Sequence, residues 1–188
     1  RDLHSFPTRR SSDLLEHAAN ESGICKELFE NHDERPTNSF LYSLVMDTYS
    51  FGYSSSGFTD MPMNHKVFLA QFDAIKKLAS EGPCVMVGRC ADYALSEYKD
   101  CFSVFVHADT DWRINRLSQK HNKTAKEAKD MINKTDKSRS SYYNYYTNKK
   151  WGAASSYNLC VDSSKLGIDG AAKAIIQAIE IFDSIKNK

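Results

Sequence analysis

The chain has 188 residues, and its 25 lysines and arginines nearly balance its 24 aspartates and glutamates, for a formal net charge of +1. This balance argues against the basic surface that binds nucleic acids or anionic membranes. No apolar run reaches the roughly 18 residues that a membrane-spanning helix needs, and the length suits one ordinary domain with its own core.

The first fourteen residues, Arg1 to Leu14, resemble the translation of a common short-read sequencing adapter, residue for residue. We therefore expect residues 1–14 to be an adapter-derived tail that is not native and has no packed role. The natural sequence is then expected to begin near Leu15; the alternative is a natural, disordered basic tail. The leader holds three basic and two acidic residues, so 22 of each sign remain in the rest of the chain.

Residues 15 to about 31 have the pattern of a helical stretch, whereas residues 36–63 are rich in serine, glycine and aromatic side chains. The second segment predicts a mobile loop or small excursion rather than a separate domain. A helix follows, with Asn64 as its N-cap, an end near Glu81 and Gly82 as the stop signal. Its predicted apolar face consists of Phe68, Phe72, Ile75 and Ala79.

Three short apolar runs predict strands at 83–88, 101–106 and 158–162. Each run is almost continuously hydrophobic, which is typical of a sheet that is covered on both faces. Helical segments separate the runs, and strands that alternate with helices predict βαβ units with right-handed crossovers. The sequence therefore predicts an α/β fold with a parallel sheet.

Three helices are predicted in the C-terminal half. Asp109 is the expected N-cap of the first helix, and Thr124 opens the second, with Glu127 three residues later completing a capping box. The last helix covers about 169–185. The residues expected to face inward from the first of these helices are Ile114 and Leu117.

The chain has five cysteines, an odd number at irregular spacing without a C-x-x-C pair. Those within the apolar runs are expected to be free thiols that pack as small hydrophobic side chains. This usage predicts a reduced, cytoplasmic protein. The histidines show no ligand spacing, so no structural metal site is expected.

Gly88 and Arg89 directly follow the first predicted strand. In open α/β sheets, ligands bind beyond the carboxyl ends of the strands. A glycine there lets the backbone approach a ligand, and an arginine can bind a phosphate through paired hydrogen bonds. The alternative is a surface arginine in an ordinary turn between a strand and a helix.

Charged residues share one face of the long helix, where Asp136, Arg139 and Tyr143 are spaced by three and four. Arg113 and Arg116 form a basic pair on the preceding helix. Phosphoryl transfer needs charge neutralisation and in-line positioning by arginine, lysine and Mg²⁺, which converging arginines at a sheet edge would provide. The alternatives are a surface-stabilising pair of Asp136 with Arg139 and ordinary charge on an exposed helix.

Motifs spread along residues 15–182 carry a family resemblance. They are Glu21-Ser22-Gly23, Asp33-Glu34-Arg35-Pro36-Thr37-Asn38-Ser39-Phe40-Leu41-Tyr42, Gly82-Pro83-Cys84-Val85-Met86-Val87-Gly88-Arg89-Cys90-Ala91-Asp92-Tyr93, Asp136-x-x-Arg139-x-x-Tyr142-Tyr143-x-x-Tyr146-Thr147, Lys150-Trp151-Gly152, Tyr157-x-Leu159-Cys160 and Ser164-Lys165-Leu166-Gly167-Ile168. In this order and density they resemble the cytidylate kinase-like family, a branch of the P-loop nucleoside monophosphate kinases.

The resemblance implies a three-layer P-loop kinase-like α/β fold, as one incomplete domain over residues 15–188 that lacks its first strand and phosphate loop. It places a monophosphate-binding excursion at about 36–63 and a lid with its following helix at about 109–150. It implies transfer of the ATP γ-phosphoryl group to CMP or dCMP, with ATP and Mg²⁺ as cofactors. The implied partners are small-molecule nucleotides, with no nucleic acid and no membrane.

The resemblance also implies roles for individual residues. Arg89 matches the arginine of a Gly-Arg-Asp motif that contacts the substrate phosphate. Asp136 and Arg139 match a D-x-x-R pair that binds the sugar and phosphate of the monophosphate nucleotide. Arg113 and Arg116 fall where lid arginines clamp the transferring phosphate.

The sequence departs from the family pattern in several places. Cys90 stands where the classical motif has aspartate, a position that bears on base or sugar recognition, and Ile132 stands where a further arginine is expected. No Gly-x-x-x-x-Gly-Lys-[Ser/Thr] motif occurs, whereas relatives in this branch carry an atypical Gly-rich loop at the N-terminus. We therefore expect this chain to be catalytically inactive.

Two alternatives come from other classes: a non-catalytic nucleotide-binding or regulatory module of the same fold, and a structural α/β protein whose arginines are surface charge. Native upstream codons that encode a Gly-rich loop would favour the enzyme. Loss of the first strand is expected to leave the strands at 84–88 and 103–107 with facing edges unpaired, or to force them together. Unpaired edges promote aggregation.

Overall fold

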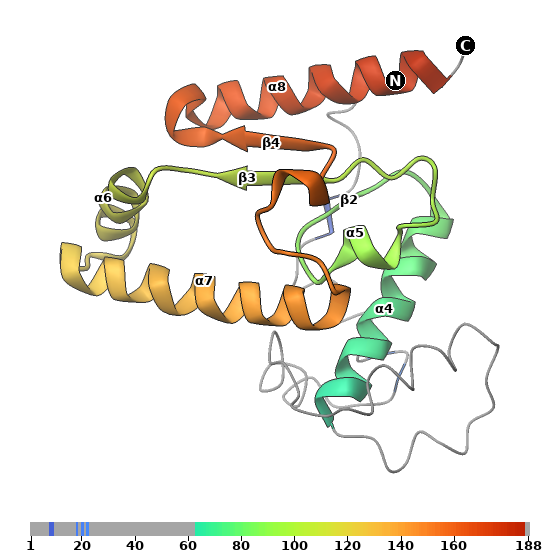
Figure 1. Ribbon diagram of the computed structural model, residues 1–188, viewed down its shortest axis with the longest axis horizontal. Coiled ribbons are helices and arrows are strands. Elements are labelled where there is room, and N and C mark those ends of the chain that lie inside the picture. The colour runs from blue at the N-terminus through green and yellow to red at the C-terminus, as the bar shows by residue number, and fades with distance from the viewer. Residues whose placement is uncertain (1–7, 10–17, 19, 21, 23–62, 187–188) are drawn as a thin grey trace. The chain divides into compact units, whose positions relative to one another are not determined.

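The computed structural model describes residues 8, 9, 18, 20, 22 and 63–186 (Figure 1). The chain divides into two compact units, which we describe separately: an N-terminal unit up to Glu97 and a C-terminal unit from Tyr98. The single domain expected over residues 15–188 stays a prediction.

Two segments of the N-terminal unit are described only in part. Of the helical stretch predicted over 15–31, Ala18, Asn20 and Ser22 are helical, and Ser22 Oγ–H donates to the Ala18 carbonyl at 2.6 Å. The remainder of that stretch lies outside the described residues. The excursion predicted over 36–63 does so as well, apart from its last residue.

The N-terminal unit contains a short parallel sheet and two fully described helices. Its elements are β1 Thr8–Arg9, α4 Met63–Glu81, β2 Val85–Met86 and α5 Ala91–Ala94. Thr8 lies opposite Val85 and Arg9 opposite Met86 in the β1–β2 ladder. The expectation that the leader has no packed role is therefore wrong, because backbone N–H and C=O groups at a strand edge pair with any extended partner, whatever its sequence.

Helix α4 buries the apolar face that its sequence pattern predicts. Phe68 and Ile75 are 2% and 0% exposed. The helix begins at Met63, so the predicted N-cap Asn64 lies inside its first turn. Helix boundaries shift by a residue when several groups compete for the first unbonded N–H donors. At the other end Gly82, with a φ of 148°, follows the last helical residue as predicted.

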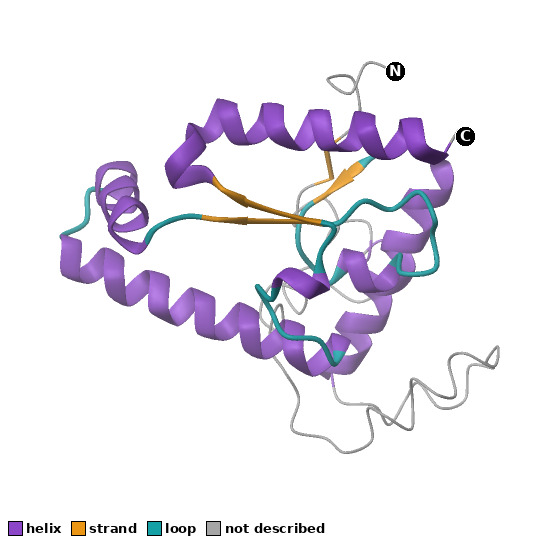
Figure 2. Cartoon of the chain, turned by 45° about the horizontal axis from the view of Figure 1, so that its top comes forward, coloured by secondary structure: helices purple, strands orange, loops and turns teal. Residues whose placement is uncertain are grey.

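The C-terminal unit combines a parallel strand pair with helices (Figures 1 and 2). Its elements are β3 Val104–His107, α6 Thr110–His121, α7 Ala125–Thr147, the 3₁₀ helix η3 Ala154–Ser156, β4 Leu159–Asp162 and α8 Ser163–Lys186. The ladder runs from Val104 opposite Leu159 to His107 opposite Asp162, and α8 packs along it (Figure 1). Parallel pairing with intervening helices confirms the predicted α/β class.

Both N-cap residues predicted in this unit, Asp109 and Thr124, are confirmed. The carboxylate of Asp109 caps α6 and accepts the N–H of Asp111 at 2.9 Å and of Trp112 at 3.2 Å. Thr124 and Glu127 form the capping box of α7: the Thr124 N–H donates to Glu127 Oε2 at 2.8 Å, and the Glu127 N–H donates to Thr124 Oγ1 at 3.3 Å. Chiefly the bond from the Thr124 backbone lowers the pKa of the Glu127 carboxyl.

The strands are less covered than their hydrophobicity predicts. Val85, Val87 and Val106 are 45%, 51% and 53% exposed. Within the described residues β2 pairs only with β1 and β3 only with β4. The expectation for the facing edges of the strands at 84–88 and 103–107 stays a prediction, because these strands belong to different units.

Helix α8 starts earlier than predicted, at Ser163 rather than near 169, and Gly167 (φ 68°, ψ 174°) interrupts it. The predicted helix corresponds to the part after this break. Several of its apolar side chains are more than half exposed, including Ile181 at 61% and Ile185 at 66%. Over the described residues, no helix is long and apolar enough to cross a membrane.

Candidate functional site

The turn after β2 is the most strained backbone near a predicted site. Gly88, Arg89 and Cys90 have φ values of 76°, 57° and 53°. Glycine adopts positive φ freely, but each of the other two residues pays of order 1–3 kcal/mol for it. The turn is closed by hydrogen bonds from the Ala91 N–H to the Gly88 carbonyl at 3.1 Å and from the Ala94 N–H to the Cys90 carbonyl at 3.0 Å. Such strain at the carboxyl end of a strand is typical of binding sites.

The side chain of Arg89 is buried beside this turn. It is 9% exposed, and Cys90 after it is 5% exposed. Arg89 has interactions of its own, and its buried Nε and Nη1 atoms make no hydrogen bond to the described residues. The alternative of a surface arginine in an ordinary turn does not fit this burial. Phe72 of α4 packs against Tyr93 of α5 with ring centroids 6.2 Å apart, which holds the short helix that follows the turn.

Arg113 and Asp136 form the main ion pair of the C-terminal unit. Two nearly parallel hydrogen bonds join them, from Nη1 to Oδ2 at 2.7 Å and from Nη2 to Oδ1 at 2.8 Å. Their side chains are 33% and 28% exposed. The hydrogen bonds to Asp136 are the main cause of a raised pKa for Arg113. The pair ties α6 to α7 and joins a residue expected in catalysis to one expected in substrate binding.

Arg116 is held differently from Arg113, although the two lie one turn apart on α6. Its guanidinium lies over the ring of Trp112, with 5.4 Å between the guanidinium carbon and the ring centroid. Within the described residues this cation–π contact, rather than a carboxylate, holds the guanidinium of Arg116. Arg139 is exposed on α7, one turn beyond Asp136, and has interactions of its own.

An aromatic cluster fixes the C-terminal end of α7 against β3. The Phe105 ring lies 5.2 Å from that of Trp151 and 5.0 Å from that of Tyr157, and Tyr157 stacks on Tyr143 of α7 at 6.0 Å. Gly152, at φ 73°, lies so close that a Cβ on it would be 3.2 Å from Phe105 Cζ. The Lys150-Trp151-Gly152 motif is therefore explained by packing, which steadies the helix that carries Asp136.

A hydrogen-bonded network joins the carboxyl ends of β3 and β4 to the start of α6. The Asp109 N–H donates to Ser164 Oγ at 3.1 Å, and the Ser164 N–H donates to Asp162 Oδ1 at 2.9 Å. Ser163 Oγ–H donates to the His107 carbonyl at 3.0 Å. Chiefly the hydroxyl of Ser164 lowers the pKa of Asp162. Ser164 begins one of the motifs of the family resemblance, but neither serine was predicted as a site residue. Two hydroxyls directly after a strand are the signal that could have found them.

The six predicted site residues divide between the two units. Gly88 and Arg89 belong to the N-terminal unit, and the other four belong to the C-terminal unit. The structure brings Arg113 and Asp136 into direct contact, whereas Arg116 is held by Trp112. No group of three or more histidine, cysteine, aspartate or glutamate side chains in the described segments is placed to hold a metal ion.

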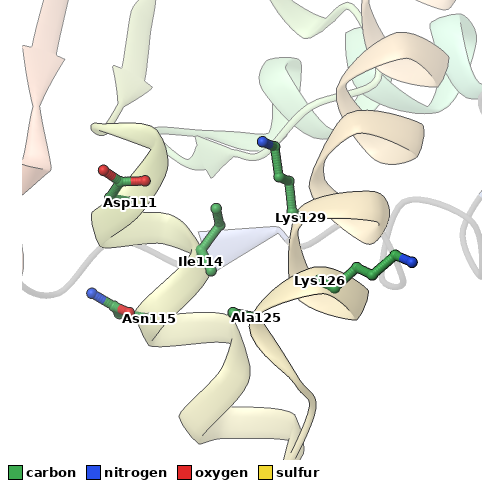
Figure 3. A pocket seen from close by; sticks show the side chains of 6 residues that line it. All are labelled: Asp111, Ile114, Asn115, Ala125, Lys126 and Lys129. Atoms are coloured by element: carbon green, nitrogen blue, oxygen red, sulfur yellow. The ribbon is translucent and has the colours of Figure 1, made fainter.

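An open groove of about 560 Å³ lies between α6 and the first turns of α7 (Figure 3). Its lining includes none of the six predicted residues, so its shape adds nothing to their assignment. The lining consists of Asp111, Ile114, Asn115, Ala125, Lys126 and Lys129.

Residues 8–165 match the cytidylate kinase-like family. The chain belongs to the cytidylate kinase-like family. It is also similar to the crystal structure of an uncharacterized protein from Eubacterium ventriosum ATCC 27560, with a TM-score of 0.69 and 26% sequence identity over 94% of this chain and 85% of that one. No curated protein matches the chain significantly.

Membership in the cytidylate kinase-like family indicates a nucleotide kinase-like protein. The match begins at residue 8, inside the leader of residues 1–14, and β1 lies in the same stretch. The adapter origin of the leader stays an interpretation of the sequence.

Proposed function

We propose that this chain has the three-layer P-loop kinase-like fold and binds CMP or dCMP as phosphoryl acceptor, with ATP as donor. The buried arginine in the strained turn after β2 supports the proposal most directly. Arg89 is only 9% exposed at the carboxyl end of a strand, in a chain of the cytidylate kinase-like family. An arginine binds phosphate through paired, charge-assisted hydrogen bonds, and a nucleotide phosphate is the anion that suits this family.

The family resemblance gives each predicted residue a role in this reaction. Gly88 and Arg89 would contact the acceptor phosphate, and Arg139 is assigned to the monophosphate nucleotide. Arg113 and Arg116 would stabilise the charge that develops as an acceptor phosphate oxygen attacks the γ-phosphorus and ADP leaves. Mg²⁺ would neutralise the donor phosphates, which are the ligands it usually takes together with one or two carboxylates.

We further propose that the chain as printed binds nucleotide without efficient turnover. The sequence contains no Gly-x-x-x-x-Gly-Lys-[Ser/Thr], the motif whose backbone N–H groups cradle donor phosphates. This observation favours the second candidate function, a non-catalytic nucleotide-binding or regulatory module of the same fold. The reduced, cytoplasmic setting predicted from the cysteines suits either function.

The decisive experiment is calorimetric titration of CMP into the wild-type chain and the Arg89→Ala variant. Loss of the phosphate contact should weaken CMP binding by about tenfold or more, in line with a charge-assisted hydrogen bond. Lys77→Ala, which removes an exposed positive charge from α4, is the matched control and should bind CMP as the wild type does. Equal affinity in all three proteins would refute an acceptor site at Arg89.

A coupled assay of ADP formation from ATP and CMP separates the two candidate functions. Turnover that depends on CMP identifies an enzyme. CMP binding without turnover identifies the binding module.

A further inference from the structure

The pairing of Arg113 with Asp136 changes what Asp136 can do for a nucleotide. The family resemblance assigns Asp136 to the substrate directly. In the structure both of its oxygens are bound by one guanidinium, at 2.7 and 2.8 Å. A carboxylate in such a fork fixes the plane of the guanidinium as well as its position.

The fork leaves Arg113 able to bind an anion. It uses one hydrogen of Nη1 and one of Nη2, so Nε–H and the second hydrogen of each Nη remain as donors in the plane that Asp136 sets. Arg113 is 33% exposed, so solvent and ligands have access to it. A phosphate can therefore share this guanidinium with Asp136.

The elements that carry the pair are anchored on both sides. Helix α6 is capped by Asp109, whose N–H also donates to Ser164 at 3.1 Å. Helix α7 begins at the Thr124 capping box and is held near its end by the stacking of Tyr143 on Tyr157. A partly exposed ion pair adds little to stability, so orienting Arg113 is the larger effect that this geometry can have.

We propose that Asp136 is a positioning residue that orients Arg113 for a polyphosphate and does not itself contact the nucleotide. The inference rests on the proposed function for the identity of the anion, the phosphates of a nucleotide. Arg116 on the same helix is the contrast, because within the described residues the ring of Trp112 holds it rather than a carboxylate. Asp136 thus neutralises part of the positive charge of Arg113 but fixes the direction of the remaining N–H donors of Arg113.

The test uses inorganic tripolyphosphate, which carries phosphates without a sugar or a base, titrated into the full chain at about 0.15 M salt. Asp136→Asn removes a negative charge, so electrostatics alone would tighten binding by up to about fivefold. A positioning role predicts the opposite change in affinity: Arg113 becomes mobile in Asp136→Asn, and tripolyphosphate binding should weaken about threefold or more. Asp136→Glu, which keeps a carboxylate within reach of Arg113, should restore much of the affinity.

Asp130→Asn is the matched control, because it removes the same charge from an exposed position on the same helix. It should bind tripolyphosphate as the wild type does or slightly more tightly. Arg113→Gln should weaken binding, and adding Asp136→Asn to it should cause no further loss. If Asp136→Asn fails to fold in a thermal melt, Arg113→Lys takes its place, since it keeps the charge but cannot form the fork.

Three results would overturn the proposal. The first is tighter or unchanged tripolyphosphate binding by Asp136→Asn (or by Arg113→Lys in its place), and the second is no tripolyphosphate binding by the wild type. The third is an Asp136→Asn variant that loses CMP binding but keeps tripolyphosphate binding, which would identify Asp136 as a direct ligand of the sugar. If tripolyphosphate binding depends on Asp136 but CMP and ATP yield no ADP, the positioning role is supported and the proposed kinase activity is refuted.

Discussion

The replacement of Gly152 by alanine tests the packing that holds α7 against β3. At its φ of 73° an alanine pays about 1–2 kcal/mol relative to glycine. The new Cβ would lie 3.2 Å from Cζ and 3.3 Å from Cε1 of Phe105, closer than ordinary contact. The ring cannot retreat easily, because Trp151 and Tyr157 pack on it at 5.2 and 5.0 Å. Crowding of this kind costs about 1–3 kcal/mol, so the total destabilisation should be about 2–5 kcal/mol.

Thermal melting followed by circular dichroism measures this effect. For a chain of this length the expected loss lowers Tm by roughly 4–20 °C. Gly170→Ala is the control: its φ is not positive, and its Cβ would meet only Leu166 Cβ at 3.3 Å, a contact that a small backbone shift at the break beside Gly167 would relieve. An alanine in a helix gains up to about 1 kcal/mol, so Gly170→Ala should keep or raise Tm. The reasoning fails if Gly152→Ala melts no lower than Gly170→Ala.

Three further predictions concern local interactions. Thr124→Ala should cost about 1 kcal/mol in urea denaturation at neutral pH by removing the hydroxyl that caps α7, and a variant as stable as the wild type would refute the capping role. The pKa of Glu127 should rise only in part, because the backbone N–H of residue 124 still donates to its carboxylate. Burial lowers the pKa of His65 from its ordinary 6.5. Between pH 6.5 and that lower pKa only the unfolded chain takes up the proton, so the free energy of unfolding should fall as the pH drops through this range. His65→Gln should flatten this limb of the denaturation profile, and an unaltered profile would assign it to other groups. Ser164→Ala should raise the pKa of Asp162 in an NMR titration, whereas an unchanged value would show that the hydroxyl contributes nothing.

Features set by neighbouring residues were predictable from the sequence. Asp109 and Thr124 cap α6 and α7 as their spacing indicates, because a cap needs only the three residues that follow it. The parallel pairing of β3 with β4 follows from the alternation of strands and helices. The error at Asn64 is a shift of the α4 boundary and has the same local origin.

Features set by packing were not predictable. The contact of Arg113 with Asp136 spans 23 residues and depends on how α6 and α7 meet, whereas the sequence offered Arg139 as the nearer partner. The burial of Arg89 depends on the turn after β2 rather than on its residue type. Exposure of Val106 could not be foreseen either, because hydrophobicity does not reveal whether a strand has neighbours on both sides.

The short β1–β2 ladder has a practical consequence for handling the protein. Its hydrogen bonds join backbone to backbone, so a different extended peptide could in principle replace Thr8–Arg9, even when supplied as a separate molecule. The strand that would accept it leads within three residues into the turn at Arg89. An affinity tag fused ahead of Thr8 can therefore alter the turn at Arg89, and nucleotide binding should be measured with the tag at the C-terminus.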